Sequence, residues 1–517
     1  MDSATGDSNL YQWVEGHARE RPDSVAVTGV GPSLTWAQLV DTVDRVSGGL
    51  ASLGVEPGDV VAAQLPNIPE FLILLLAAVR RGAILQTLHM PYREAELGSL
   101  LRHGRASAVV VPSVSGDRRP VDELLSLKSS LPDLRHVITV GEATPGTSSF
   151  GDLVTGGPVP APTPAGPDDP FLLLYTSGTT SGPKGVAHTS RRFLGNAAGA
   201  SDELGLTPGD RVTSLAPFTH LYGLFTLHIA LAAGATTAMV TAFHPPTLIP
   251  TLEELSPTAL FTAPAHLAPF VDAGRFEPAL FEPTRFVCLS GSTVPPALAR
   301  AVDDLVPDGS VIGLWGMTEI QVGTFGRPHD PLDTRVNTAG RAAPGMELRI
   351  VDGGGTRVEP GGEGELQVRG PSVFDSYLRD PVSTAEAFTA DGWFRTGDLA
   401  RIDENGFVTL TGRTKEIINR GGIKYNPAEV EAIVGGHPAV AACAVVPVPD
   451  PVLGERGCLC VQTHPGSSVD LEQVKALLDD HRVAKFKWPE RLELFDELPM
   501  TPTRKVRRGE LRAMISP

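Results

Sequence analysis

A run of small hydroxyl residues and glycines follows an apolar stretch in the middle of the chain and ends in a lysine. From Tyr175 to Val186 it reads Tyr-Thr-Ser-Gly-Thr-Thr-Ser-Gly-Pro-Lys-Gly-Val. Glycines let backbone N–H groups converge on an anion, hydroxyls add donors, and lysine neutralises charge. A Walker loop would need glycine in place of Pro183 and Ser or Thr in place of Gly185. The segment therefore predicts a phosphate-binding loop of another kind, rather than a flexible surface turn.

This loop closely resembles the phosphate loop of the acyl-adenylate-forming superfamily, which reads T-S-G-T-T-G-x-P-K-G. That superfamily includes the acyl-CoA synthetases, the adenylation domains of peptide synthetases and firefly luciferase. The chain departs from the pattern at Ser181-Gly182, where the glycine has moved by one place. The resemblance implies that the loop binds the phosphates of ATP and that its lysine also acts in catalysis. The loop residues assigned in this way are Thr176, Ser177, Gly178, Thr179, Thr180 and Lys184.

Two further segments resemble motifs of the same superfamily. Pro217-Phe218-Thr219-His220 resembles P-x-x-H, which implies that His220 lines the acyl pocket beside the substrate carboxylate and contributes to catalysis. A single histidine is more often a core residue, and the motif is what favours the site here. The segment Ser290-Gly291-Ser292-Thr293 resembles the strand end that holds adenine, which assigns Gly291, Ser292 and Thr293 to the nucleotide.

The segment Trp-Gly-Met-Thr-Glu resembles the Y-G-x-T-E motif of the superfamily. The resemblance places Trp315 and Gly316 at the nucleotide, and Thr318 at the α-phosphate as a catalytic residue. It also makes Glu319 a catalytic residue and a ligand of Mg²⁺, a hard cation suited to a carboxylate, with Thr176 as a second metal-binding residue. Trp315 replaces the usual tyrosine, so stacking on adenine is retained and a phenol hydrogen bond is lost.

Motifs toward the C-terminus complete the resemblance. Trp-Phe-Arg-Thr-Gly-Asp resembles W-x-x-T-G-D, which implies that Asp398 accepts hydrogen bonds from both ribose hydroxyls. Arg413 would contact ribose and phosphate, and Lys415 would be the pivot about which a small domain turns. Gly421 and Gly422 would border the pantetheine tunnel during thioester formation.

The last motif, Leu-Pro-Met-Thr-Pro-Thr-Arg-Lys, resembles L-P-x-T-x-x-G-K. Lys505 then matches the lysine that bridges the acyl carboxylate and the α-phosphate, where an ammonium suits the charge that develops in the transition state. Arg504 replaces the glycine of the family. Arg507 and Arg508, which follow, are expected to form a solvated basic tail.

Apolar and amphipathic stretches alternate in the first half of the chain. Residues 60–63 and 108–111 predict strands, and residues 69–79 predict a buried helix ended by Arg80-Arg81-Gly82. Residues 171–175 predict a buried strand, preceded by an exposed extended linker over the six prolines of residues 156–170. This alternation predicts an α/β layered fold with largely parallel sheets.

The chain has 517 residues, which is too long for one compact core. Short β segments follow Glu363, and the last hundred residues show a small α+β pattern. The resemblance implies a large N-terminal domain, residues 1–413, that binds ATP and the acid and consists of two α/β subdomains plus a small β-barrel. Residues 414–517 would form a small mobile α+β lid domain, with the hinge near Lys415.

Composition excludes several classes of protein. Lys plus Arg number 43 and Asp plus Glu number 60, so the net charge of −17 disfavours nucleic acid as a partner. The N-terminus lacks the features of a signal peptide, and the longest apolar run, residues 71–79, is too short to cross a bilayer, so a cytoplasmic protein without a membrane partner is expected. Cys458 and Cys460 would be buried apolar side chains on one face of a strand, rather than zinc ligands.

The resulting hypothesis is an AMP-forming acid–CoA ligase. It would use ATP, Mg²⁺ and coenzyme A to convert a carboxylic acid into acyl-AMP and pyrophosphate, and then into acyl-CoA. The alternative acceptor is the phosphopantetheine of an acyl carrier protein or a separate partner. A homodimer is possible, since dimers are common among relatives. A degenerate nucleotide sensor is disfavoured because the five charged motif residues are present: Lys184, Glu319, Asp398, Arg413 and Lys505.

The acid itself is less constrained. Residues 219–225 contain no acidic residue, which disfavours an amino acid substrate by analogy with amino-acid-activating relatives. The residues expected to line the acyl pocket are mostly small or apolar, which favours a bulky hydrophobic monocarboxylate. These residues are His220, Tyr222, Gly223, His266, Gly291, Gly316, Val322 and Gly323.

Overall fold

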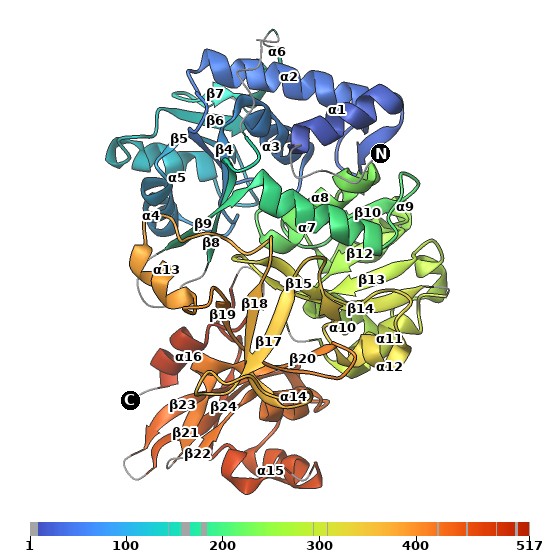
Figure 1. Ribbon diagram of the computed structural model, residues 1–517, viewed down its shortest axis with the longest axis vertical. Helices are drawn as coiled ribbons and strands as arrows, with labels where there is room; N and C mark the ends of the chain where they lie inside the picture. Colours follow the sequence, from blue (N-terminus) through green and yellow to red (C-terminus); the bar gives the residue numbers. More distant parts are fainter. Residues whose placement is uncertain are drawn as a thin grey trace. The chain divides into compact units, whose positions relative to one another are not determined.

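The computed structural model describes residues 9–515, except for 143, 156, 158–165, 177–182, 293, 308, 421–422, 451–452, 482 and 502–504. The chain forms two compact units (Figure 1). One comprises Met1–Met346 with Arg369–Ala387, and the other comprises Glu347–Val368 with Phe388–Pro517. The predicted domain boundary after Arg413 and the hinge at Lys415 stay predictions.

The first unit contains a seven-stranded sheet in the order β7-β6-β5-β3-β4-β8-β9. Its strands are parallel except for the antiparallel pair β8–β9. Parallel strands covered on both faces need continuous apolar runs, which is why the three strands predicted in this region are confirmed. The strands are β3 (Val60–Ala63), β4 (Ile84–Thr87), β5 (Ala106–Pro112), β6 (His136–Val140), β7 (Ser148–Ser149), β8 (Pro170–Thr176) and β9 (Lys184–Thr189).

A nine-stranded sheet in the same unit has the order β16-β15-β14-β13-β12-β10-β11-β1-β2. It is parallel from β14 to β1, and β2, β15 and β16 are antiparallel at its two edges. The strands are β1 (Val25–Thr28), β2 (Leu34–Thr35), β10 (Arg211–Ser214), β11 (Thr236–Ala238), β12 (Ala259–Thr262), β13 (Phe286–Leu289), β14 (Ser310–Met317), β15 (Gln321–Phe325) and β16 (Arg341–Ala342).

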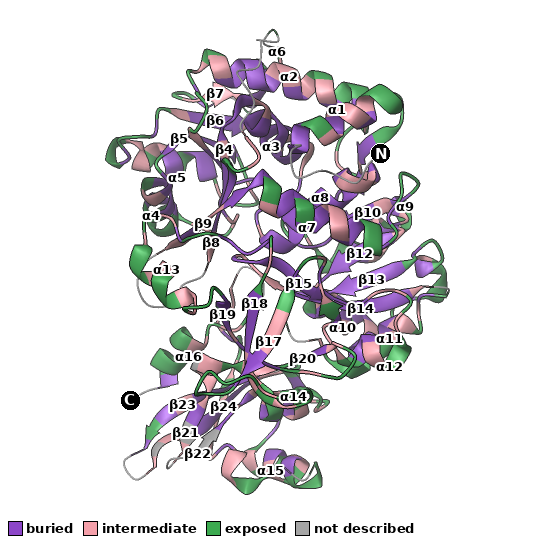
Figure 2. Cartoon of the chain, in the orientation of Figure 1, coloured by how far each residue is buried: buried purple, intermediate pink, exposed green. Residues whose placement is uncertain are grey.

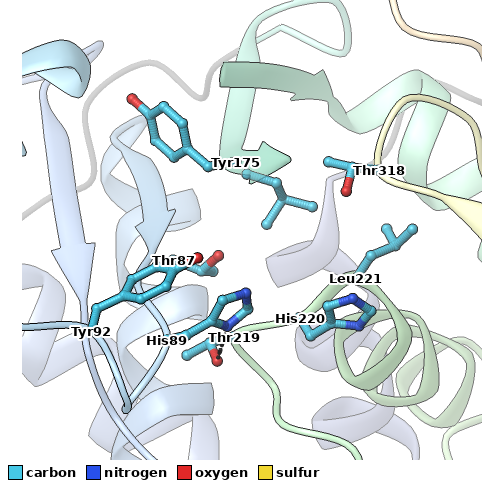
Figure 3. A pocket seen from close by; sticks show the side chains of 9 residues that line it. Thr87, His89, Tyr92, Tyr175, Thr219, His220, Leu221 and Thr318 are labelled. Atoms are coloured by element: carbon cyan, nitrogen blue, oxygen red, sulfur yellow. Dashed lines mark hydrogen bonds between the residues drawn. The ribbon is translucent and has the colours of Figure 1, made fainter. Parts of the chain in front are cut away.

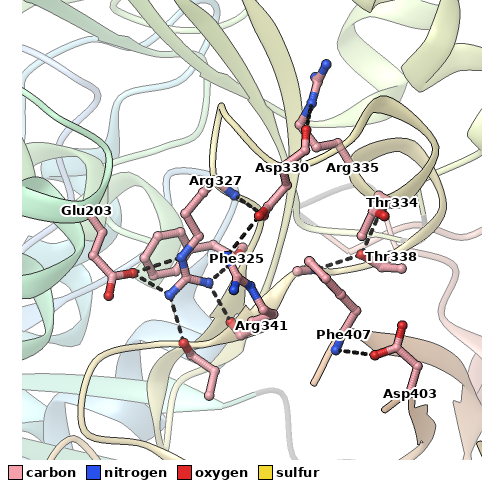
Figure 4. A network of polar contacts seen from close by, with 12 residues as sticks. Glu203, Phe325, Arg327, Asp330, Thr334, Arg335, Thr338, Arg341, Asp403 and Phe407 are labelled. Atoms are coloured by element: carbon pink, nitrogen blue, oxygen red, sulfur yellow. Dashed lines mark hydrogen bonds and ion pairs between the residues drawn. The ribbon is translucent and has the colours of Figure 1, made fainter. Parts of the chain in front are cut away.

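A polar network secures one edge of the nine-stranded sheet (Figure 4). The Nε atom of Arg327 donates to Glu203 at 2.8 Å, and its guanidinium also donates to the carbonyl oxygens of Phe325 and Arg341. Asp330 accepts a hydrogen bond from the guanidinium of Arg341 at 2.8 Å. Because an uncovered edge exposes unpaired backbone groups, these bonds stabilise the last strands by joining them to helix α7.

Helices cover the large sheets, and the most apolar of them are the most deeply buried (Figure 2). Helix α3 begins with Pro69, ends at a left-handed Gly82 and is buried from Phe71 to Val79, as expected for a helix that is apolar all round. Helices α7 and α8 pack side by side (Figure 1). The helices are α1 (Leu10–Glu20), α2 (Trp36–Ser52), α3 (Pro69–Arg81), α4 (Glu94–Gly104), α5 (Pro120–Leu127), α6 (Phe150–Thr155), α7 (Ser190–Glu203), α8 (Leu221–Ala233), α9 (Leu248–Leu255), α10 (Pro264–Asp272), α11 (Pro296–Asp303), α12 (Leu332–Asn337) and α13 (Pro381–Ala387).

The second unit contains two smaller sheets. The small β-barrel expected from the resemblance takes the form of a four-stranded sheet, β17-β18-β19-β20, and a five-stranded sheet has the order β22-β21-β24-β23 with β25 beside β24. The predicted segments after Glu363 lie in β18 and β20. The elements are β17 (Glu347–Val351), β18 (Glu363–Arg369), β19 (Phe394–Ile402), β20 (Val408–Arg413), β21 (Ile418–Arg420), β22 (Ile423–Tyr425), β23 (Val440–Asp450), β24 (Gly454–Thr463), β25 (Arg491–Phe495), α14 (Ala428–Gly435), α15 (Leu471–Asp480) and α16 (Arg508–Ile515).

Two predictions for this unit can be compared with the structure. Cys458 and Cys460 are fully buried in β24, which confirms that they are core residues. The solvated tail is confirmed for the exposed Arg507 and is wrong for Arg508, whose guanidinium pairs with Glu431 at 2.5 Å. The reason is that α16 buries apolar side chains against β23, which brings its first residue onto that carboxylate.

Among the described residues, no helix is both long and apolar enough to cross a lipid bilayer. The long proline-rich linker predicted at residues 156–170 lies mostly outside the described residues, and β8 already begins at Pro170.

Candidate active site

The carboxyl ends of the parallel strands define where the site lies in the first unit. Strands β10, β12, β13 and β14 are parallel neighbours, so the loops that follow them meet at one edge of their sheet. Strands β4 and β8 end in the same way in the other sheet. Residues at the ends of some of these strands and in the loops that follow line one pocket (Figure 3). Its lining consists of Thr87, His89, Tyr92, Leu174, Tyr175, Thr219, His220, Leu221 and Thr318.

The predicted phosphate loop connects two paired strands. Thr176, the last residue of β8, lies opposite Lys184, the first residue of β9, in an antiparallel ladder. The two ends of the loop therefore lie beside each other at the carboxyl end of a buried strand, and Lys184 is the residue at which β9 begins. Ser177, Gly178, Thr179 and Thr180 lie outside the described residues, so their assignment to phosphate stays a prediction.

Glu319 and Lys184 are connected through a residue that no motif above includes. The hydroxyl of Tyr377 donates to Oε1 of Glu319 at 2.8 Å, and the Lys184 ammonium lies over the Tyr377 ring, 4.9 Å from its centroid. Burial and the neighbouring Glu319 carboxylate raise the pKa of Tyr377, so the phenol remains a hydrogen-bond donor. Tyr377 is 58 residues from Glu319 in a segment without a periodic pattern, and no sequence signal could have assigned it.

The backbone of Thr318 is hydrogen-bonded to another residue that the motifs do not include. The Nε2 atom of the buried His188, in β9, lies 2.7 Å from the carbonyl oxygen of Thr318. Burial lowers the pKa of His188 to about 4, so the imidazole is neutral. A carbonyl oxygen can only accept, so Nε2 carries the proton.

His220 begins helix α8 and lines the pocket, as predicted for the P-x-x-H segment. Its Nδ1 atom accepts a hydrogen bond from the N–H of Tyr222 at 3.2 Å, which caps the helix and fixes the ring. The Tyr222 hydroxyl donates to the carbonyl oxygen of Cys288 at 2.8 Å, which joins α8 to β13.

The motifs also miss a second histidine in the pocket. In Figure 3, His89 and Tyr92 lie on the side of the pocket opposite His220 and Leu221. The His89 ring shares a hydrogen bond of 3.0 Å with the Thr219 hydroxyl, and burial lowers the pKa of His89 to about 4. Its position directly after an apolar stretch is the signal that could have identified it, because ligands bind where parallel strands end.

Three of the glycines expected to line the acyl pocket have no room for a side chain. A Cβ atom on Gly223 would lie 2.1 Å from the Pro217 carbonyl oxygen, and one on Gly323 would lie 2.4 Å from the Trp315 ring. A Cβ on Gly316 would lie 2.0 Å from the carbonyl oxygen of the residue that opens β15. Neighbouring atoms therefore exclude a side chain at these positions, and the role of these glycines in lining the acyl pocket stays a prediction.

The remaining residues assigned to adenine and the acid lie around the ends of β12, β13 and β14. Gly291 has a left-handed φ of 90° in the turn after β13, and a Cβ atom there would make an ordinary contact of 3.8 Å with Ala263. Ser292 follows it, and Thr293 lies outside the described residues. His266 stacks on Phe243, with ring centroids 4.2 Å apart. Val322 is bonded to the Asn196 amide through its backbone.

In the second unit, three predicted residues lie close together. Asp398 and Arg413 are partners in the β19–β20 ladder, with the Arg413 Nε atom 2.9 Å from the Asp398 carboxylate. Lys505 is an exposed residue, yet protein atoms crowding its ammonium and the charge of Arg413 lower its pKa, against the opposing effect of Asp398 and Glu416. The Lys415 side chain, Gly421 and Gly422 lie outside the described residues.

Two family models match the chain. The model described as AMP-binding enzyme matches residues 14–378, and the model described as AMP-binding enzyme C-terminal domain matches residues 429–505. The chain belongs to the AMP-binding enzyme family. This membership confirms the predicted AMP-forming, acyl-adenylate-forming superfamily.

Known proteins are similar to this chain along nearly its full length. The medium-chain fatty-acid–CoA ligase of Escherichia coli (strain K12) is 34% identical over 516 residues, which cover 98% of this chain and 90% of that ligase. The salicyl-AMP ligase / salicyl-S-ArCP synthetase of Mycobacterium tuberculosis (strain ATCC 25618 / H37Rv) is 33% identical over 502 residues, covering 95% and 87%. The crystal structure of the anthranilate CoA ligase AuaEII in complex with anthranoyl-AMP matches with a TM-score of 0.90 and 25% identity, covering 100% of this chain and 99% of the other. These likenesses confirm the predicted mixed α/β fold.

Proposed function

We propose that this chain is an AMP-forming acid–CoA ligase that activates a carboxylic acid as acyl-AMP and transfers the acyl group to coenzyme A. The observation that carries the proposal is the pocket at the carboxyl ends of the strands, where Thr318, Tyr175 beside the predicted phosphate loop, and His220 meet. The names of relatives support acid activation, since they include a fatty-acid–CoA ligase and an anthranilate CoA ligase.

In the first half-reaction, the ionised carboxylate of the acid attacks the α-phosphorus of ATP, forming a P–O bond as pyrophosphate leaves. No side-chain base is required, because the acid is already deprotonated at neutral pH. Catalysis then depends on positioning, on charge neutralisation by Lys184 and Lys505, and on a hydrogen bond from the Thr318 hydroxyl to the α-phosphate. In the second half-reaction, the small domain turns about Lys415, and the thiol sulfur replaces AMP on the acyl carbon.

The side chains present fit a magnesium ion that is bound mainly by the nucleotide. The described residues contain no group of three His, Cys, Asp or Glu side chains that could hold a metal without further ligands. Mg²⁺ commonly uses one or two protein oxygens and completes its shell with water and substrate phosphates. Glu319, a buried carboxylate, would therefore hold the ion, with Thr176 as a second oxygen donor. When bound, Mg²⁺ neutralises charge on the phosphates.

A carrier protein is the second candidate acceptor of the acyl group. It is supported by one relative that is named salicyl-AMP ligase / salicyl-S-ArCP synthetase. The acid is proposed to be a hydrophobic monocarboxylate, aliphatic or aromatic, in keeping with the names of the three relatives and with the apolar Leu174 and Leu221 in the pocket.

Pyrophosphate release over a panel of carboxylic acids, with and without coenzyme A and with products identified by mass spectrometry, tests this proposal. Acyl-CoA and AMP formed together are the expected products. Acyl-AMP that accumulates despite coenzyme A, and disappears when a phosphopantetheinylated carrier protein is added, would support the second acceptor. Absence of pyrophosphate release with every acid, in protein that binds ATP, would overturn the enzymatic proposal.

A further inference from the structure

Tyr377 lies between the two charged residues that the proposed function assigns to ATP and its metal ion. Its hydroxyl donates to the Glu319 carboxylate at 2.8 Å, and its ring centroid lies 4.9 Å from the Lys184 ammonium. Tyr377 and Glu319 are both buried, with 8% and 5% of their surfaces exposed. A phenol donating to a carboxylate and a cation over the same ring are both favourable, and they are stronger away from water.

The backbone around Tyr377 is joined to both of its partners. Val186 and Tyr377 form an antiparallel β-bridge, two residues after Lys184 in β9. The N–H of Phe374 donates to the backbone carbonyl oxygen of Glu319 at 2.8 Å. The segment is therefore bonded to the strand that carries the lysine and to the turn that carries the glutamate, so the position of the phenol follows from that of both groups.

In the part of the chain that the structure describes, no carboxylate oxygen lies within 4.0 Å of the Lys184 ammonium, although its charge is among the causes that lower the pKa of Asp380. The ring of Tyr377 occupies the space beside the ammonium, and its hydroxyl holds the carboxylate of Glu319. Without this ring, the half-buried lysine and the buried glutamate would attract each other. Such a pair would cancel the positive charge needed for phosphate and the negative charge needed for a metal ion.

We infer that Tyr377 is a positioning residue that separates Lys184 from Glu319 and orients the Glu319 carboxylate for magnesium bound to ATP. This inference rests on the proposed function, because it needs ATP and a metal ion at this site. The ring keeps the ammonium directed to phosphate, and the hydroxyl sets the direction of the carboxylate. Each role belongs to a different part of one side chain, so they can be removed one at a time.

The experiment measures equilibrium binding of ATP by calorimetry, with Mg²⁺ and with EDTA, in the absence of any acid and therefore without turnover. Tyr377→Phe removes the hydroxyl and keeps the ring. It is expected to weaken ATP binding about tenfold in Mg²⁺ and to leave binding in EDTA within about twofold of the wild type. Tyr377→Leu also removes the ring, so it is expected to weaken ATP binding in both conditions.

The chain offers a matched control far from the site in sequence. The Tyr11 hydroxyl donates to Asp44 at 2.6 Å, and the Arg80 guanidinium lies over its ring at 4.6 Å. Unlike the cation at Tyr377, this guanidinium also pairs directly with the carboxylate, at 2.8 Å, so Tyr11 matches Tyr377 in its phenol–carboxylate bond and not in charge separation. Tyr11→Phe is expected to lower the unfolding temperature by a similar amount to Tyr377→Phe and to leave ATP binding unchanged in Mg²⁺ and in EDTA. A general loss of stability is thereby distinguished from a loss of positioning.

A double-mutant cycle with Glu319→Gln completes the test, because the hydroxyl is inferred to act through that carboxylate. In the Glu319→Gln background, Tyr377→Phe is expected to cause no further loss of Mg²⁺-dependent ATP binding. Equal loss in Mg²⁺ and EDTA, or wild-type binding in both, would overturn the inference while leaving the proposed ligase intact. Failure of the wild-type protein to bind ATP would instead overturn the proposed function.

Discussion

The Nε2 atom of His188 donates a hydrogen bond of 2.7 Å to the carbonyl oxygen of Thr318, 130 residues further along the chain. His188 lies in β9, which begins with Lys184, and Thr318 lies in the turn between β14 and β15. The bond therefore connects the strand that leaves the phosphate loop with the turn that carries the proposed phosphate and metal ligands. Burial lowers the pKa of His188 to about 4, so the ring stays neutral at pH 7 and donates through Nε2.

Replacement of His188 tests this connection. His188→Leu leaves the Thr318 carbonyl without its donor, so we expect the stability and the rate of acid-dependent ATP–pyrophosphate exchange to fall, the rate by about tenfold. His188→Gln supplies an amide N–H and should recover part of both losses. Exchange rates and urea unfolding curves of the three proteins measure the effects. A leucine variant with wild-type exchange would show that the contact does not position Thr318.

Acid should destabilise the protein before its carboxylates titrate. His188 and His228 are fully buried and His89 is half-buried, and removal from water lowers the pKa of each to about 4. Their pKa values rise to about 6.5 on unfolding, so the unfolded state binds more protons between pH 4 and 6.5, and the free energy of unfolding falls as the pH drops through this window. Each histidine can contribute at most about 3 kcal/mol of stability at neutral pH that is lost near pH 4.

Urea unfolding followed across this window measures the effect. His228 lies in an aromatic cluster with Phe171 and Phe193, so His228→Phe removes one titrating group with a side chain of related shape. We expect the dependence of unfolding free energy on pH to be shallower in this variant by about one proton. A wild-type protein equally stable at both ends of the window would contradict the assignment of neutral buried histidines.

Lys505 is expected to act in one half-reaction alone. Lys505→Ala should lower the rate of acyl-AMP formation by about 10²–10³-fold, if its ammonium stabilises charge in the transition state. Attack of coenzyme A on preformed acyl-AMP should change little. Single-turnover measurements of the two steps separate these effects, and Arg507→Ala, at an exposed residue in the same segment, serves as the control. Equal losses in both steps would contradict a role confined to adenylation and the proposed domain rotation.

Gly323 should tolerate no side chain. A Cβ atom there would lie 2.4 Å from the Trp315 ring and 2.9 Å from Ile320, so alanine must displace the ring proposed to stack on adenine. We expect Gly323→Ala to lower stability by about 1–3 kcal/mol and to weaken ATP binding. Urea unfolding and calorimetric titration with ATP report the two effects. A stable variant that binds ATP like the wild type would show that Trp315 does not define the adenine site.

At Gly195, in contrast to Gly323, we expect alanine to stabilise the protein. Gly195 lies in helix α7, is exposed, and has no atom within 4 Å of a Cβ built on it. Gly195→Ala should therefore stabilise the protein by about 0.5–1 kcal/mol, because alanine loses less backbone entropy in a helix. Its ATP binding should equal that of the wild type, which shows that the effect of Gly323→Ala depends on position.

Local sequence patterns predicted an element correctly where one continuous apolar segment forms it. The strand at residues 171–175, the helix from Pro69 and the buried Cys458 and Cys460 are confirmed, because continuous apolar runs have few ways to avoid water. Arg508 was misjudged, since a basic residue in a polar tail gives no sign of the carboxylate that the fold brings to it. The lack of room for a side chain at Gly323 also needed the structure, because the pairing of β14 with β15 brings the Trp315 ring against it.

The sequence by itself determined the family, the order of the motifs and the charged residues proposed to act on ATP, because each motif is a short run whose chemistry depends on residue type and spacing. Only the tertiary structure decided which groups orient those residues. Tyr377 reaches Glu319, His188 reaches Thr318 and His89 reaches Thr219 across 58, 130 and 130 positions. Such contacts arise when strands from distant segments pair and pack, and no local pattern of residues encodes which distant side chain will occupy the space beside a given one.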